Sequence, residues 1–90
     1  MGAKMTLLFP NPSRSFDFSR NAVSFVGYDD LAVITFYVDA GALAPAHEGD
    51  YSPDQCLIAF DHEIEVIHNA ARKVYLKGKS TSNLLKATDF

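Results

Sequence analysis

The sequence predicts a small α+β domain in which an antiparallel β-meander packs against one long C-terminal helix, and a short C-terminal strand returns to the sheet. Two patterns lead to this fold class. Apolar and polar residues alternate through residues 15–38 between turn-forming residues, as in consecutive antiparallel strands. Residues 53–77 instead repeat apolar side chains every three or four positions, as in a helix that covers a sheet. Ninety residues are enough for one such domain.

The alternating region predicts three strands joined by short turns: residues 15–18, 22–26 and 31–38. The last of these is the richest in β-branched and aromatic residues, which favour strands. Pro10 and Pro12 exclude residues 9–13 from a central strand, because proline cannot donate to the ladder. The chain is therefore divided into an N-terminal extension and loop, residues 1–14, and a single domain, residues 15–90.

The start of the long helix is specific. Ser52 is a good N-cap, Pro53 suits the first turn, and Gln55 completes a capping box. Gly78 is a typical helix terminator, so one uninterrupted helix is expected before it. Residues 83–88 then form a modest strand that returns to the sheet edge.

The helix carries an apolar surface wider than contact with one sheet requires. Its main stripe consists of Leu57, Phe60, Ile64, Ile67, Ala71 and Val74. A second set flanks the stripe: Cys56, Ala59, Val66 and Ala70. Two interpretations remain open. The domain buries the helix deeply in a groove, or the small side chains of Ala59, Val66 and Ala70 form a self-association face against a second copy.

Glu63 falls inside the apolar arc of this helix, where an unpaired carboxylate is costly to bury. One interpretation is a tuned acid or base. The other, which we favour, is a residue at the rim of the arc or one paired with Arg14 or Arg20, because ion-pair networks also perturb carboxylates.

The histidines do not form a recognisable metal motif. His62 and His68 are six residues apart, so on a regular helix they point about 120° away from each other and cannot bind one metal together. Glu65 and His68 have the spacing of di-iron bundles, but those sites need four helices. Cys56 lacks a nearby base and is expected to be a buried apolar residue. No catalytic set, metal or cofactor is therefore expected.

The charges are divided between the two ends of the helix. Residues 48–65 contain acids and no base, and residues 72–86 contain bases and no acid. Stabilisation of the helix dipole explains this distribution without a partner. The basic end is nevertheless a candidate polyanion contact, formed by Arg72, Lys73, Lys77 and Lys79 with Tyr75 and Tyr28 as stacking surfaces. The net charge of −3 favours the first interpretation.

Several segments resemble a bacterial family known as domain of unknown function 1488: residues 5–11, residues 25–29 with the strand that follows, residues 70–75 and residues 84–90. The resemblance extends over nearly the whole chain from Met5. It implies a cytoplasmic protein with a compact α+β fold. It implies no activity and no catalytic residues.

Two functions remain after this reasoning. The first is a non-enzymatic interaction or regulatory module that binds a protein partner or forms a homodimer. The second is a weak nucleic-acid-binding regulator that uses the basic end of the helix. A single cysteine and the absence of a signal-peptide pattern place the protein in the cytoplasm, and no apolar run is long enough to span a membrane.

Overall fold

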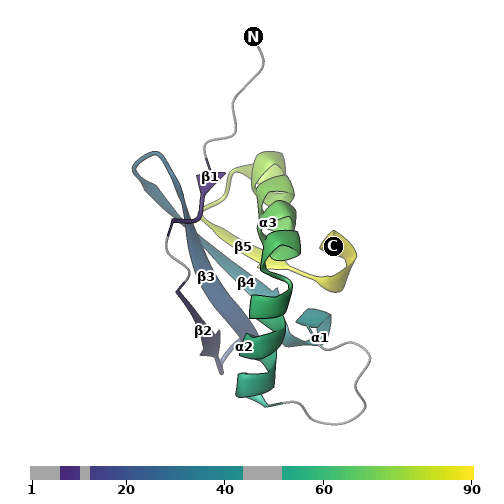
Figure 1. The fold of residues 1–90 in the computed structure, drawn as a ribbon. Helices are drawn as coiled ribbons and strands as arrows, with labels where there is room; N and C mark the ends of the chain where they lie inside the picture. The colour runs from purple at the N-terminus through teal and green to yellow at the C-terminus, as the bar shows by residue number, and fades with distance from the viewer. Residues whose placement is uncertain (1–6, 11–12, 44–51) are drawn as a thin grey trace.

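A computed structural model describes residues 7–10, 13–43 and 52–90. It confirms the α+β class: a mixed five-stranded sheet carries helices α2 and α3 along one face (Figure 1). The strands are β1 (Leu7–Leu8), β2 (Arg14–Asp17), β3 (Ala22–Asp29), β4 (Ala32–Asp39) and β5 (Ser82–Leu85). The helices are α1 (Ala40–Leu43), α2 (Pro53–His62), α3 (Ile64–Gly78) and the 3-10 turn η1 (Ala87–Asp89).

The predicted meander is present as β2, β3 and β4, which pair antiparallel in chain order. The β3–β4 hairpin is in register from Ala22 opposite Asp39 to Asp29 opposite Ala32, so Asp30 and Leu31 form its turn. Asp30 adopts φ 58°, which suits a tight hairpin turn. The returning strand β5 pairs parallel with β4, because the helices between them carry the chain back across the sheet.

The sheet begins earlier in the chain than predicted. β1 and β2 pair antiparallel with the same edge of β3, at its C-terminal and N-terminal ends respectively. Leu7 is fully buried in the core, although the sequence analysis placed it in an extension before residue 15. A two-residue strand is too short to show alternation, and the prolines that follow it suggested a loop.

The prediction of one uninterrupted helix is wrong, because the helix is broken at a single residue. Glu63 separates α2 from α3 with φ −108° and ψ 24°, and its N–H donates to the carbonyl oxygens of both Ala59 and Phe60. The start is as predicted: the Ser52 hydroxyl accepts from the Gln55 N–H at 3.1 Å, and the Ser52 N–H donates to the Gln55 amide oxygen at 2.9 Å. At the other end, Gly78 is still helical and Lys79 takes the left-handed conformation, with φ 50°.

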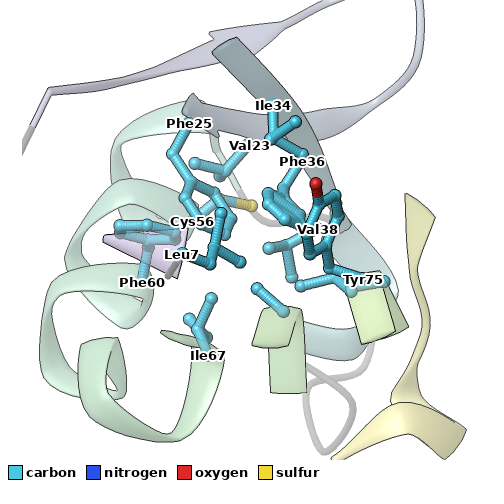
Figure 2. Close-up of a cluster of buried hydrophobic side chains, with 13 residues drawn as sticks. Leu7, Val23, Phe25, Ile34, Phe36, Val38, Cys56, Phe60, Ile67 and Tyr75 are labelled. Atoms are coloured by element: carbon cyan, nitrogen blue, oxygen red, sulfur yellow. The ribbon is translucent and has the colours of Figure 1, made fainter. Parts of the chain in front are cut away.

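The core lies between the sheet and the helices (Figure 2). Odd-numbered residues of β3 and even-numbered residues of β4 point toward the helices, because side chains alternate along a strand. They meet Phe60, Ile67 and Ala71 of the predicted stripe and Cys56 of the set that flanks it, as the deep-groove interpretation expects. The core also contains Tyr75, which belongs to neither predicted set. Leu57, Ile64 and Val74 pack against this cluster and are partly buried.

Two contacts tie the outer strands to the helices. The Arg14 guanidinium of β2 donates to both carboxylate oxygens of Asp61 in α2, at 2.9 and 2.7 Å. This pair lowers the pKa of Asp61. The ring of Phe9, just after β1, stacks on His68 of α3 with centroids 4.0 Å apart. Both contacts help to orient the helices over the same face of the sheet.

Candidate protein-interaction surface

The second face of the sheet carries no helix among the residues that the structure describes. Even-numbered residues of β3 and odd-numbered residues of β4 point to this side, away from α2 and α3. We call it the open face. It consists of three rows of side chains that run across the strands. The pairing register between the strands defines which residues belong to each row.

The first row is apolar. Register places Leu8 of β1 beside Tyr28 of β3, and Tyr28 beside Val33 of β4. Leu8 and Val33 are 60% and 52% exposed, so both side chains project from the sheet. An exposed row of large apolar side chains is typical of a surface that binds another protein.

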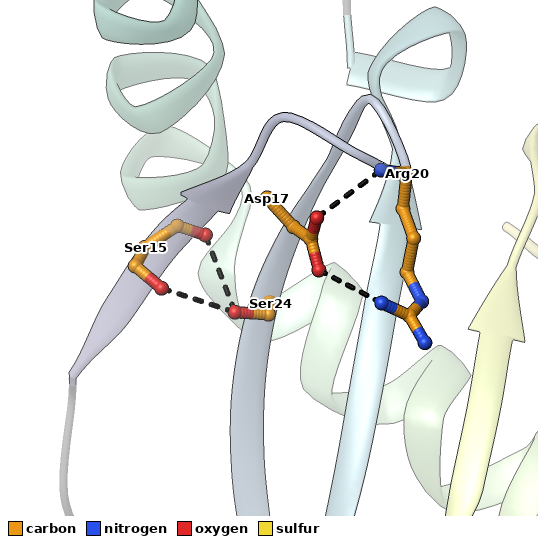
Figure 3. A network of polar contacts seen from close by, with 4 residues as sticks. All are labelled: Ser15, Asp17, Arg20 and Ser24. Carbon is orange, nitrogen blue, oxygen red and sulfur yellow. Dashed lines mark hydrogen bonds and ion pairs between the residues drawn. The ribbon is translucent and has the colours of Figure 1, made fainter.

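The two other rows are uncharged as well. The middle row contains Val26, Thr35 and Ser82. The third row contains Ser15, Ser24, Tyr37 and Leu84. The hydroxyl groups of Ser15 and Ser24 lie 3.1 Å apart and are hydrogen-bonded (Figure 3). Leu84 is 48% exposed at the edge of this row.

Charged residues lie beyond the third row, where the β2–β3 turn folds over the sheet. The Arg20 guanidinium binds the Asp17 carboxylate at 3.1 Å, and the Arg20 backbone N–H binds the other oxygen of the same carboxylate (Figure 3). The guanidinium also lies 4.4 Å from the centre of the Tyr37 ring, a cation–π distance. The charge of Arg20 is therefore paired with Asp17, and the guanidinium lies over a residue of the third row.

Next to this pair the open face is hollowed. The hollow has a volume of about 360 Å³ and is lined by Arg20, Tyr37, Asp39, Ser82, Asn83 and Leu84. These residues come from the β2–β3 turn, β4 and β5, and the guanidinium of Arg20 lies over the Tyr37 ring. The open face thus has projecting apolar side chains near one end and a recess near the other.

The predicted polyanion contact is not assembled as one surface. Lys73 and Lys77 are exposed on α3, which covers the opposite face of the sheet from the open face. Arg72 turns inward instead, where it donates to the Leu7 carbonyl at 3.4 Å and lies 5.1 Å from the centre of the Phe9 ring. Tyr75 is buried, and its hydroxyl donates to Asp29.

These inward contacts form a second polar cluster at the junction of β1, β3 and α3. Burial, and then the nearby Arg72, lower the pKa of His68. The hydrogen bond to Asp29 raises the pKa of Tyr75. The Phe9 ring covers the imidazole of His68 at 4.0 Å and so occupies the space that a substrate would need. The best explanation of the cluster is structural: its contacts hold β1 against α3.

The other candidate residues are dispersed. Glu63 is exposed at the helix break, and neither Arg14 nor Arg20 binds it, because their partners are Asp61 and Asp17. The carboxylate is therefore at the rim and not buried within the apolar arc.

The proposed self-association face on the helices is not one continuous surface. Ala70 is only 2% exposed and packs inside its own domain, whereas Val66 is exposed and Ala59 is half-buried. Because Ala70 is buried in its own domain, a second copy of the chain cannot contact it in this arrangement. Among the described residues, the open face of the sheet offers an uncharged surface that extends across several strands.

The described residues hold no cluster of three side chains that could bind a metal ion. Cys56 is buried, as predicted, and burial raises the pKa of its free thiol. A thiol in this environment is a poor nucleophile. In the described part of the chain, no helix is both long and apolar enough to cross a membrane.

The sequence analysis missed the open face. It assigned one side of each strand to the core and did not follow the other side. A signal was present in residues 31–38, where Val33 and Tyr37 alternate with core residues and leave both sides of the strand apolar. A strand of this kind is covered on both faces or offers one of them to a partner.

Comparison with known proteins places the chain among proteins of unknown function. The family model described as "Protein of unknown function (DUF1488)" matches residues 7–83. A crystal structure of a DUF1488 protein from Shewanella loihica has 19% sequence identity and a TM-score of 0.80, with 93% of this chain and 96% of the other aligned. At that identity the similarity establishes the fold. The comparison with curated proteins gives no match.

Proposed function

The chain belongs to the DUF1488 family, whose description assigns no activity, and we propose from its own surface that it is a non-enzymatic protein-interaction module. The open face of the sheet is the binding surface. Leu8, Val33 and Leu84 are the side chains that a partner covers, with Tyr28 and Tyr37 between them.

One observation carries this proposal: the residues of three consecutive rows across the sheet are all uncharged, and the Arg20 guanidinium, which lies over the Tyr37 ring of the third row, is paired with Asp17. Protein interfaces have this composition, because their centres are depleted of charge and enriched in tyrosine while their rims are polar. A solvated sheet face usually alternates with polar residues instead.

The other classes of function have less support. A nucleic-acid site would need its cations beside its stacking surfaces. Here Lys73 and Lys77 lie on the helical side, away from Tyr28 and Tyr37 on the open face, and Tyr75 is buried. Arg20 does lie beside Tyr37, but it is paired with Asp17. An enzyme would need a nucleophile beside a base, and the buried thiol of Cys56 does not offer one.

Site-specific photo-crosslinking in the native host tests the proposal. A photoreactive amino acid replaces Thr35, at the centre of the open face, or Ile58, which is 60% exposed on α2 and serves as the matched control. We expect discrete crosslinked protein bands from position 35 and none from position 58. Equal or absent crosslinking at the two positions would refute an interaction surface on the sheet.

A further inference from the structure

We propose that residues 7–10 form a strap over the core, and that protonation of His68 opens this strap while the rest of the domain stays folded. The strap consists of β1 with Phe9 and Pro10, which follow it. It carries Leu8, a residue of the first row of the open face. Opening would therefore remodel the surface that we propose as the binding site. This consequence rests on the proposed function, whereas the opening itself does not.

The strap has a short attachment to the sheet. Two residue pairs join β1 to β3, Leu7 with Asp29 and Leu8 with Tyr28, whereas eight pairs join β3 to β4. Segments with few backbone pairs are the first to open locally in a folded protein. The strap therefore depends on its side-chain contacts to stay closed.

Two side chains of α3 hold the strap against the core, in which Leu7 is fully buried. The Phe9 ring is nearly parallel to the His68 imidazole, with an interplanar angle of 7° and centroids 4.0 Å apart. The Arg72 guanidinium donates to the Leu7 carbonyl at 3.4 Å and lies 5.1 Å from the centre of the Phe9 ring. His68 and Arg72 thus contact the same short segment, and they do so through the same ring.

The surroundings of His68 favour the neutral imidazole. The side chain is half-buried, with the Phe9 ring stacked on it and the Phe25 ring centred 5.8 Å away. Burial, and then the guanidinium of Arg72, lower the pKa of His68. Protonation would place a second cation beside the Phe9 ring, where the fixed charge of Arg72 repels it. The closed strap is therefore compatible with the neutral form and disfavours the charged one.

The other ionisable groups near this site leave that direction unchanged. Glu65 lies one turn before His68 on α3, but it is exposed, so water and salt screen its charge. On β3, Asp29 accepts a hydrogen bond from the Tyr75 hydroxyl. The strap itself contains no ionisable side chain, and the core-facing residues of β4 are apolar.

Opening should therefore increase as the pH falls. An open strap leaves His68 in water, where the pKa of histidine is about 6.5. In the closed state the pKa lies below that value. The open form binds the proton more readily, so it is favoured once the pH drops below about 6.5. Between pH 7.5 and pH 5.5, one such group raises the equilibrium constant for opening by at most about tenfold.

Thiol labelling of the full chain tests the opening. Leu7→Cys puts a thiol at a fully buried position of the strap, while the natural Cys56, also fully buried but in α2, reports on unfolding of the rest of the domain. Mass spectrometry measures labelling at both sites at pH 7.5 and pH 5.5. Each rate is divided by that of the same thiol in the urea-unfolded chain at that pH. We expect position 7 to label faster than Cys56, and the ratio to rise severalfold at the lower pH.

Two histidine variants identify the group that takes up the proton. His68→Phe in the Leu7→Cys chain keeps a ring beside Phe9 and removes the titrating group, so the ratio should no longer depend on pH. His62→Phe, at an exposed position of α2, is the matched control and should keep the full dependence. Circular dichroism verifies that each chain is folded at both pH values.

Hydrogen exchange repeats the comparison in the unsubstituted chain, where the core is unchanged. The protection of the amides of Leu8 and Phe9, relative to that of β4, should fall by a similar factor between the two pH values. This measurement decides the question if Leu7→Cys weakens the fold.

The outcomes separate this inference from the proposed function. If position 7 and Cys56 label at the same normalised rate, the strap opens only when the domain unfolds and the inference is wrong. It is also wrong if the ratio does not change with pH, or if the His68→Phe chain keeps the dependence. Crosslinking from position 35 would still support the proposed function in those cases. An acid-opened strap without such crosslinking would retain the inference and remove only its consequence for the open face.

Discussion

The ring of Phe9 occupies the space over Gly27 that a side chain at that position would fill. A Cβ atom on Gly27 would lie 2.7 Å from Cε1 of Phe9 and 3.0 Å from a methyl carbon of Leu7. Phe9 lies there because it also contacts the rings of Phe25 and His68, with centroids 5.8 and 4.0 Å away. The lack of a side chain on β3 thus lets the N-terminal segment close the core beneath α3.

Gly27→Ala should destabilise the domain, because neither β3 nor the packed Phe9 ring can move freely. Overpacking of this kind costs about 1–3 kcal/mol in the free energy of unfolding. Chemical denaturation measures it. Gly78→Ala is the matched control: apart from its chain neighbours and the backbone of its own helix, no atom lies within 4 Å of its added Cβ. Alanine also favours a helix, so stability should rise by up to about 1 kcal/mol. Equal effects at the two glycines would contradict the packing.

His68 makes the stability of this junction depend on pH. Burial and Arg72 lower the pKa of His68 in the folded state, so the unfolded chain binds a proton more readily. Stability should therefore fall as the pH drops below about 6.5, the ordinary pKa of histidine. Asp61, whose pKa is lowered from an already acidic value, loses its contribution only at lower pH.

Denaturation at pH 7.5 and at pH 5.5 measures this dependence. His68→Phe keeps an aromatic ring stacked on Phe9 and removes the titrating group. The variant should therefore lose less stability than the natural chain between the two pH values. If both chains lose the same amount, the dependence has another source.

The fold was predictable because its main elements have regular patterns of their own. Alternation identified the strands that became β2, β3 and β4, and the capping box located the start of α2. The break at Glu63 was not predictable, since no proline or glycine occurs there and the apolar repeat continues across it. The burial of Leu7 depends on the space above Gly27, twenty residues away, and local sequence does not reveal that contact.

The candidate surface was harder to predict than the fold. The prediction for the helix concentrated on reactive side chains such as His62 and Cys56. The structure does not bring these two together, because His62 is exposed and Cys56 is buried. The open face can be recognised only when the residues beside Val33 and Tyr37 on the adjacent strands are known. The strand register alone defines those neighbours. Its residues are ordinary apolar and hydroxyl side chains, so their significance comes from the absence of charge across three strands.

The capping box at the start of α2 predicts that removal of its serine hydroxyl lowers the free energy of unfolding measurably. Ser52→Ala removes the hydroxyl that accepts from the Gln55 N–H, and this should cost about 1 kcal/mol. Ser19→Ala, in the exposed β2–β3 turn, serves as the control and should change stability by less than about 0.5 kcal/mol. A loss at residue 19 as large as that at residue 52 would contradict the assignment of the cap.

Nucleic-acid binding should be weak and nonspecific, because Lys73, Lys77 and Lys79 are exposed but Arg72 is engaged with Leu7 and Phe9. Each phosphate contact adds about 0.9 to the slope of log affinity against log salt, so binding through three lysines should be largely lost at physiological salt. A salt titration with duplex DNA and single-stranded RNA measures this slope.

Lys73→Glu combined with Lys77→Glu distinguishes the two surfaces. Both side chains are on the helical side, so the double variant should abolish any low-salt binding to nucleic acid while crosslinking from Thr35 stays unchanged. Submicromolar, sequence-dependent binding at physiological salt that the double variant abolishes would move the function to the helical side. We expect the reverse, because the acidic residues Glu63 and Glu65 are exposed along the same helical side and repel a polyanion that approaches the lysines.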